Sequence, residues 1–135
     1  MGKYLFVYGS LRRVFNHPMH RLLAAESRCI GEATWQGKLF SLYAYPGAVT
    51  SGNPADNVRG EVYELFAPEH LLPVLDAYED FLPGQESRSL YLRQGHPVQM
   101  LADSRVVTAW VYVYNQTTQG LSRVASGDWA DGFRG

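Results

Sequence analysis

Three acidic side chains fall within a five-residue stretch of the sequence, at Asp76, Glu79 and Asp80. If this stretch ends a helix, Glu79 lies four positions after Leu75 and shares its apolar face. Burial on such a face raises the pKa of a carboxyl group towards neutrality, as a general base requires. The alternative is a solvated helix end that carries three surface charges, and the pattern by itself favours this second interpretation.

A second group of candidate residues follows the apolar run over residues 4–8. The run stops at Gly9, whose backbone freedom permits a sharp turn and a close approach of the chain to a ligand. Ser10, Leu11 and Arg12 then present consecutive amides and a positive charge at that turn. The stretch predicts a small anion-binding concavity that forms the floor of a site.

The other nucleophiles and metal-binding side chains give weaker signals. His17 and His20 have the spacing of ligands on one helix face, but no further ligand accompanies them, so surface or capping roles are expected. Cys29 lies in a predicted strand and is expected to be a small core residue. Neither a nucleophile-elbow serine nor a phosphate-binding loop is found around Gly9 and Ser10. We expect no metal and no cofactor.

Many strands and two helices must position these groups. Periodicity predicts helices over 19–25 and 69–78, with Asn16 capping the first and Pro68 in the first turn of the second. The run 4–8, apolar on both faces, indicates a strand buried on both sides. Further strands are predicted over 29–42 with a turn or bulge at Gly37, and over 58–66, 88–93, 98–102 and 106–114. This order predicts a single α+β domain over residues 1–135, and pattern alone leaves open whether its sheet closes into a barrel.

The composition narrows the class of protein. The chain has 135 residues, of which 46% are hydrophobic and 19% charged, as expected for a folded domain with its own core. A net charge of −1 gives no sign of a nucleic-acid or membrane partner. One cysteine excludes an internal disulfide, and no signal peptide or membrane span is predicted, so a cytoplasmic location is expected.

Several stretches, in order along nearly the whole chain, resemble the γ-glutamylcyclotransferase-like family, which includes γ-glutamylamine cyclotransferases and AIG2-like proteins. The matching stretches are Phe6–Arg13, Tyr45–Ala48, Val58–Tyr63, Leu75–Glu79, Tyr91–Arg93, Ala109–Tyr114 and Ser126–Trp129. The final Ser-Gly-Asp-Trp makes the small bacterial members the nearest relatives. One departure is Val14-Phe15, where many relatives have a glycine after the basic residues.

The resemblance implies a small mixed β-barrel flanked by helices, with a cavity at the loop formed by Tyr8, Gly9, Ser10 and Leu11. It implies that Glu79 is the catalytic acid/base, in place of the solvated interpretation above. The implied reaction is attack of a substrate's α-amine on its own γ-carbonyl, which releases 5-oxoproline and a free amine.

The implied substrates are γ-glutamyl amino acids, γ-glutamylamines or glutathione, bound by a monomer or weak homodimer. The Gly9–Leu11 amides would hold either the substrate's α-carboxylate or the oxyanion of the tetrahedral intermediate. Tyr91 would orient Glu79 or the substrate. Two alternatives are a non-catalytic module that binds a small carboxylate-bearing metabolite in this cavity, and an interaction protein with a vestigial pocket.

Overall fold

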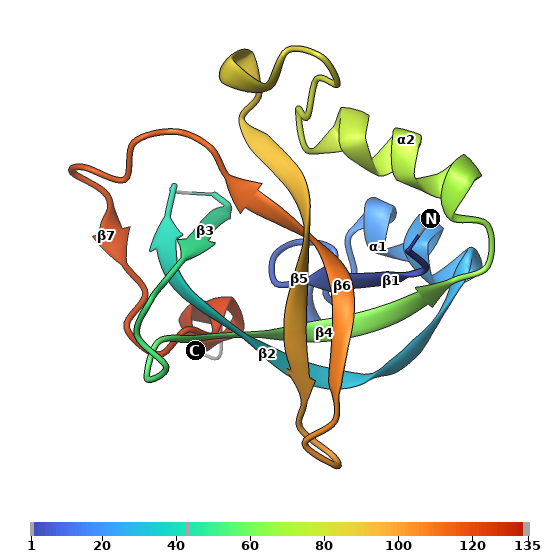
Figure 1. The fold of residues 1–135 in the computed structure, drawn as a ribbon, viewed down its shortest axis with the longest axis horizontal. Helices are drawn as coiled ribbons and strands as arrows, with labels where there is room; N and C mark the ends of the chain where they lie inside the picture. Colours follow the sequence, from blue (N-terminus) through green and yellow to red (C-terminus); the bar gives the residue numbers. More distant parts are fainter. Residues whose placement is uncertain (1, 43, 134–135) are drawn as a thin grey trace.

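A closed, mixed β-barrel forms the centre of the molecule (Figure 1). The computed structural model describes residues 2–42 and 44–133. Its strands are β1 (Tyr4–Val7), β2 (Ser27–Ser41), β3 (Pro46–Thr50), β4 (Asn57–Leu65), β5 (Tyr91–Met100), β6 (Val106–Tyr114) and β7 (Ser122–Arg123). The helices are α1 (Pro18–Ala25) and α2 (Pro68–Tyr78), and short 3₁₀ turns form η1 (Arg13–Phe15), η2 (Glu86–Arg88) and η3 (Trp129–Phe133).

The barrel runs in the order β2, β4, β1, β6 and β5, and β5 pairs again with β2 to close it. The pairing of β1 with β6 is parallel, and the other pairs are antiparallel. Strands β3 and β7 extend the sheet from the far end of β2. The expected small mixed barrel with flanking helices is therefore confirmed.

Strand β1 lies between two cores, as its apolar pattern predicted. Phe6 and the following Tyr8 belong to a cluster built from the barrel strands, with Trp35, Val62 and Val111. Leu5 and Val7 belong to a second cluster, which brings in leucines of both helices, Leu23, Leu71, Leu72 and Leu75. Burying each such side chain contributes roughly 1.5–3 kcal/mol, so the two faces of β1 hold barrel and helices together.

Two strands are longer than the sequence pattern predicted. Strand β2 is continuous over 15 residues, and its bulge lies between Cys29 and Gly31, so the predicted interruption at Gly37 is wrong. Strand β5 likewise continues across Gly95, where two short strands had been expected. Both strands cross the whole barrel and are hydrogen-bonded to neighbouring strands along their length. These hydrogen bonds outweigh the destabilising effect of glycine within a strand.

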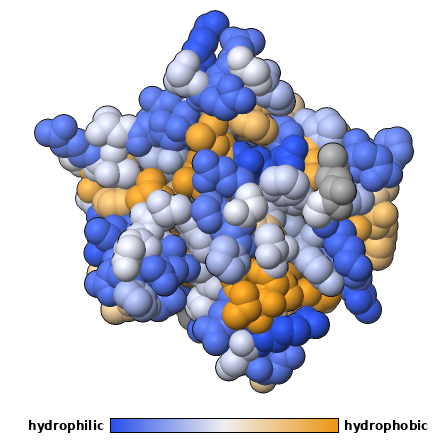
Figure 2. All heavy atoms as spheres, in the orientation of Figure 1, coloured by the Kyte–Doolittle hydropathy of each residue, from blue (hydrophilic) through white to orange (hydrophobic). Residues whose placement is uncertain are grey.

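The helices begin close to the predicted positions. Helix α2 covers the predicted range, whereas the first helix is capped by His17 in place of Asn16. The His17 Nδ1 atom accepts a hydrogen bond of 3.1 Å from the Met19 amide, which confirms the capping role expected for this histidine. No described helix has the length and apolar character needed to span a membrane. Figure 2 shows hydrophilic residues over most of one face of the molecule, with a smaller hydrophobic patch below its centre.

Candidate active site

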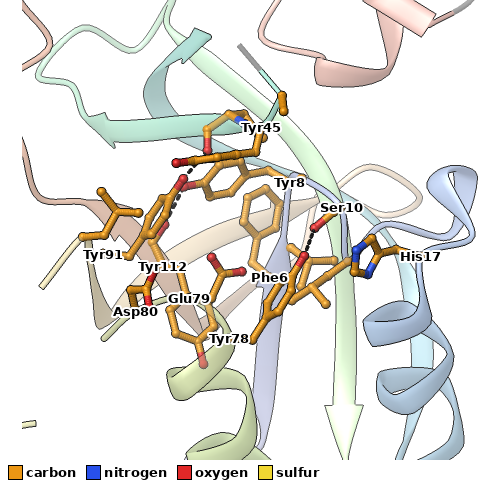
Figure 3. Close-up of a pocket in the computed structure, with 16 residues that line it drawn as sticks. Phe6, Tyr8, Ser10, His17, Tyr45, Tyr78, Glu79, Asp80, Tyr91 and Tyr112 are labelled. Atoms are coloured by element: carbon orange, nitrogen blue, oxygen red, sulfur yellow. Dashed lines mark hydrogen bonds between the residues drawn. The ribbon is translucent and has the colours of Figure 1, made fainter. Parts of the chain in front are cut away.

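A cavity of about 380 Å³ opens between the end of β1 and the C-terminal end of α2 (Figure 3). Its walls are largely aromatic. The aromatic rings belong to Phe6, Tyr8, Tyr45, Tyr78, Tyr91 and Tyr112. The loop from Gly9 to Leu11, together with Glu79 and Asp80, also lines the cavity, so the structure brings together Glu79, Tyr91 and the predicted loop residues Tyr8 to Leu11.

Glu79 directly follows Tyr78, the last residue of α2, and its side chain points into this cavity (Figure 3). Its side chain is half-buried, and no side-chain hydrogen bond joins its carboxylate to any other described residue. Burial, followed by the nearby charge of Asp80, raises the pKa of Glu79 from its ordinary 4.5 to about 7. Glu79 is therefore a carboxyl group poised to exchange a proton near neutral pH.

The three carboxylates of this stretch have different surroundings. Asp76 is buried and binds the Arg93 guanidinium through contacts of 2.7 and 3.2 Å, and it also accepts a hydrogen bond from the Tyr112 hydroxyl. Asp80 is exposed. Because Arg93 is paired with Asp76, no cation from that position offsets the burial of Glu79. The interpretation of the stretch as a solvated helix end is therefore wrong for Asp76 and Glu79.

The loop after β1 makes a tight turn at the cavity. The Arg12 amide donates to the Gly9 carbonyl at 2.9 Å. Within the described residues, the amides of Gly9, Ser10 and Leu11 have no hydrogen-bond acceptor. A Cβ atom on Gly9 would lie 3.0 Å from the Cγ of Pro46, so glycine keeps this side of the cavity open. These amides are available to an anionic ligand group.

The positive charge predicted at this loop is placed elsewhere. Arg12 is 2% exposed, and its Nη1 atom lies 2.7 Å from Oδ1 of Asp128. It does not line the cavity. Gly127 has a φ of +73° and packs closely against Asn57, since a Cβ atom at this position would lie 1.8 Å from the Asn57 carbonyl oxygen. This close packing brings Asp128 beneath the loop. The final Ser-Gly-Asp-Trp stretch therefore supplies the counter-ion that holds the loop.

Two tyrosine hydroxyls fix the upper wall of the cavity. Tyr8 donates to the Tyr112 carbonyl and Tyr91 donates to the Pro46 carbonyl, each at 2.5 Å (Figure 3). Burial and the neighbouring Glu79 raise the pKa of both tyrosines, so both hydroxyls stay protonated. Tyr91 makes no hydrogen bond to Glu79 in the free protein, although both line the cavity.

Sequence reasoning missed several lining residues. His17, Tyr45 and Tyr112 were not predicted at the site, although all three line the cavity, whereas Tyr78 was expected in its wall and lies there. The Tyr-Pro-Gly stretch around Tyr45 was the available signal, since a proline and a glycine interrupt a strand pattern there. His20 is buried, with Nδ1 2.8 Å from the Leu11 carbonyl oxygen. Among the described residues, no three His, Cys, Asp or Glu side chains lie where they could hold a metal ion.

Comparisons with known proteins show which family and which solved structures this chain resembles. Residues 5–131 match the sequence profile of the family described as "Gamma-glutamyl cyclotransferase, AIG2-like". The gamma-glutamylcyclotransferase family protein YtfP of Escherichia coli K12 is 34% identical over 128 residues, covering 94% of this chain and 96% of YtfP.

Two solved structures extend the comparison. YkqA of Bacillus subtilis has a TM-score of 0.71 and 30% identity, covering 97% of this chain but only 40% of YkqA. A mouse AIG2-like protein has a TM-score of 0.65 and 25% identity, covering 85% of this chain and 79% of the mouse protein.

Proposed function

The chain belongs to the gamma-glutamyl cyclotransferase, AIG2-like family, and we propose that it is an enzyme that converts a γ-glutamyl amide or peptide into 5-oxoproline and a free amine. The observation that carries this proposal is the half-buried Glu79 carboxyl group, with its pKa near 7, facing a cavity floored by unpartnered amides. A γ-glutamyl head carries an ammonium group and a carboxylate, which suit these two features.

The substrate supplies its own nucleophile in this reaction. Its α-amine attacks the γ-carbonyl carbon, a new C–N bond closes the five-membered ring, and the original γ-amide C–N bond breaks. A cavity that holds the glutamyl chain folded supplies most of the entropic advantage, since well-oriented intramolecular reactions reach effective molarities on the order of 10⁵ M or more. The reaction therefore needs no electron carrier and no second substrate.

Glu79 moves the proton. The ionised Glu79 first takes a proton from the α-ammonium group and releases it to solvent, so that the neutral amine becomes the nucleophile and Glu79 is ionised again. After attack, the ionised Glu79 takes a second proton from the new ring nitrogen and passes it to the departing amine nitrogen. General acid–base catalysis of this kind contributes about 10²–10⁴-fold, and it is most effective when the pKa lies near the working pH.

The amides of Gly9, Ser10 and Leu11 bind negative charge in this scheme. Two substrate groups have the necessary charge: the α-carboxylate, which is present throughout, and the oxyanion, which forms only as the tetrahedral intermediate does. Binding the first lowers KM, whereas binding the second raises kcat.

The direct test is a mass-spectrometric assay of 5-oxoproline release from a panel of γ-glutamyl amino acids, γ-glutamylamines and glutathione. Glu79→Gln retains the shape of the side chain but cannot carry the proton, so turnover should fall by at least about 10²-fold while substrate binding persists. Glu64→Gln is the control, because Glu64 lies outside the cavity and pairs with Lys3 and Arg28 at the surface.

Two outcomes would contradict the proposal. Near-normal turnover by a folded Glu79→Gln protein would remove Glu79 from the mechanism. Tight binding of a γ-glutamyl compound that the wild-type protein leaves unchanged would instead identify a non-catalytic binding module.

A further inference from the structure

A hydrogen bond crosses the cavity between the two segments that supply its chemistry. The Ser10 Oγ atom lies 2.7 Å from the Tyr78 hydroxyl oxygen (Figure 3). Ser10 belongs to the loop after β1, and Tyr78 is the last residue of α2. Among the described residues, this is the one hydrogen bond between segments 8–12 and 68–80.

The loop is anchored by several contacts at its far end, whereas, within the described residues, the Ser10 side chain at its tip has one hydrogen bond, to Tyr78. The far end is held by the buried pair of Arg12 with Asp128 and by the Arg13 amide, which donates to Glu61 at 3.0 Å. The amides at the tip make no hydrogen bond to a described residue, and Tyr78 is the hydrogen-bond partner of the Ser10 side chain. The Arg12 amide closes the turn on the Gly9 carbonyl, and the Leu11 carbonyl oxygen lies 2.8 Å from Nδ1 of His20, so Tyr78 supplies the contact that holds the Ser10 part of the loop against α2.

Tyr78 is in turn well placed to hold the loop against Glu79. It directly precedes Glu79 at the end of α2, so anchoring its side chain restrains the turn that presents the carboxylate. The ring of Tyr78 contacts the His17 ring, with centroids 5.5 Å apart, and His17 is itself fixed by capping α1. Because the ring is already restrained, the Tyr78 side chain loses less conformational entropy when it forms its hydrogen bond.

We propose that the Ser10–Tyr78 hydrogen bond sets the distance between the loop amides and the Glu79 carboxylate, and that Tyr78 is a positioning residue of the cyclisation. This inference rests on the proposed function. Ring closure requires the anion-binding amides and the proton carrier to act on one folded substrate at once. A displacement of about 1 Å between such groups can cost up to about 10²-fold in rate.

Single-atom variants test the proposal. Tyr78→Phe and Ser10→Ala each remove one hydroxyl while retaining the surrounding side chain, so each should lower kcat by about tenfold. The double variant should be no worse than either single variant, because both remove the same hydrogen bond. Ser10→Thr, which retains a hydroxyl, should recover most of the loss seen in Ser10→Ala.

Two features of the kinetics separate positioning from general damage. The pH midpoint of kcat/KM should stay near that of the wild type in Tyr78→Phe, because this variant retains the aromatic ring that lines the cavity with Glu79. Tyr4→Phe is the matched control, since it also removes a phenol hydroxyl but lies outside the cavity, and its kcat should match the wild type. Additive losses in the double variant would overturn the proposal, since each hydroxyl would then act separately.

A measurement without substrate distinguishes failure of this inference from failure of the proposed function. The Arg12 amide closes the loop turn by donating to the Gly9 carbonyl, so its hydrogen exchange reports on the loop. Exchange should become about fivefold faster in both Tyr78→Phe and Ser10→Ala and stay unchanged in Tyr4→Phe. Unchanged exchange in both cavity variants overturns the inference, even in a protein that releases 5-oxoproline.

Discussion

Glu79→Gln should make the protein more stable at alkaline pH while it abolishes the proposed proton transfer. In the folded protein the pKa of Glu79 is about 7, whereas its ordinary value is 4.5. Below pH 4.5 the carboxyl group is protonated in both the folded and the unfolded state, so it carries no penalty. Between these two values the unfolded chain releases the proton more readily, and the free energy of unfolding falls as the pH rises.

The size of the effect follows from the pKa difference. Each pKa unit is worth about 1.4 kcal/mol, so ionised Glu79 lowers the free energy of unfolding by up to about 3 kcal/mol above pH 7. Glutamine is neutral at every pH and carries no such penalty. The stability difference between Glu79→Gln and the wild type should therefore grow by up to about 3 kcal/mol from acid to alkaline pH.

Urea unfolding of both proteins at a series of pH values measures this difference directly. A constant offset between the two proteins reflects the packing of the amide, and only the change with pH reports the pKa. The titration of a ¹³C-labelled Glu79 carboxyl group by NMR, in the unliganded protein, gives the folded-state value independently.

Glu64→Gln is a control for which the change of relative stability with pH should have the opposite sign. A hydrogen bond from Lys3, followed by the Arg28 guanidinium, lowers the pKa of Glu64. Its charge therefore stabilises the wild type above about pH 4.5, and that contribution is lost as the pH falls through the lowered value. Glu64→Gln should become slightly less stable than the wild type with rising pH, as is usual for an exposed ion pair. A difference for Glu79→Gln that is independent of pH, or that follows Glu64→Gln, would refute the burial of an ionisable Glu79.

Two further predictions concern the loop. In Gly9→Val, a Cβ atom would lie 3.0 Å from the Cγ of Pro46, so the new side chain crowds the cavity. The Kd for 5-oxoproline, measured by calorimetry, should rise by about tenfold or more, with a comparatively small change in Tm. A Tm that collapses together with binding would mean that Gly9 serves the fold alone. Arg12→Met removes the guanidinium from a buried ion pair and should lower the free energy of unfolding, measured in urea, by about 3–5 kcal/mol. Adding Asp128→Leu should recover part of this loss, because no buried charge is then left unpaired. A loss below about 1 kcal/mol would show that the pair is solvated in solution.

Local patterns in the sequence predicted several elements of this fold well. Strand β6 has the predicted bounds, α2 differs by one residue, and β1 is buried on both faces. Each of these elements is specified by side-chain spacing within a short segment, which is a property of the chain before it folds. The continuity of β2 and β5 was missed because it depends on ladder partners from distant segments.

In the candidate site, too, some features were predicted from the sequence and others depend on tertiary contacts. The sequence by itself predicted a turn at Gly9 and offered Glu79 as a candidate, although its pattern favoured a solvated helix end. The resemblance then placed both in one cavity. Only the tertiary structure decided which carboxylate remains unpaired, because Arg93 reaches Asp76 across 17 positions. The tertiary structure also pairs Arg12 with Asp128, 116 positions later in the sequence, and thereby holds its charge away from the cavity. It brings Ser10 to Tyr78, which are separated by 68 positions. These partners meet because the barrel closes, and no periodicity along the chain encodes which distant charge or hydroxyl will lie opposite.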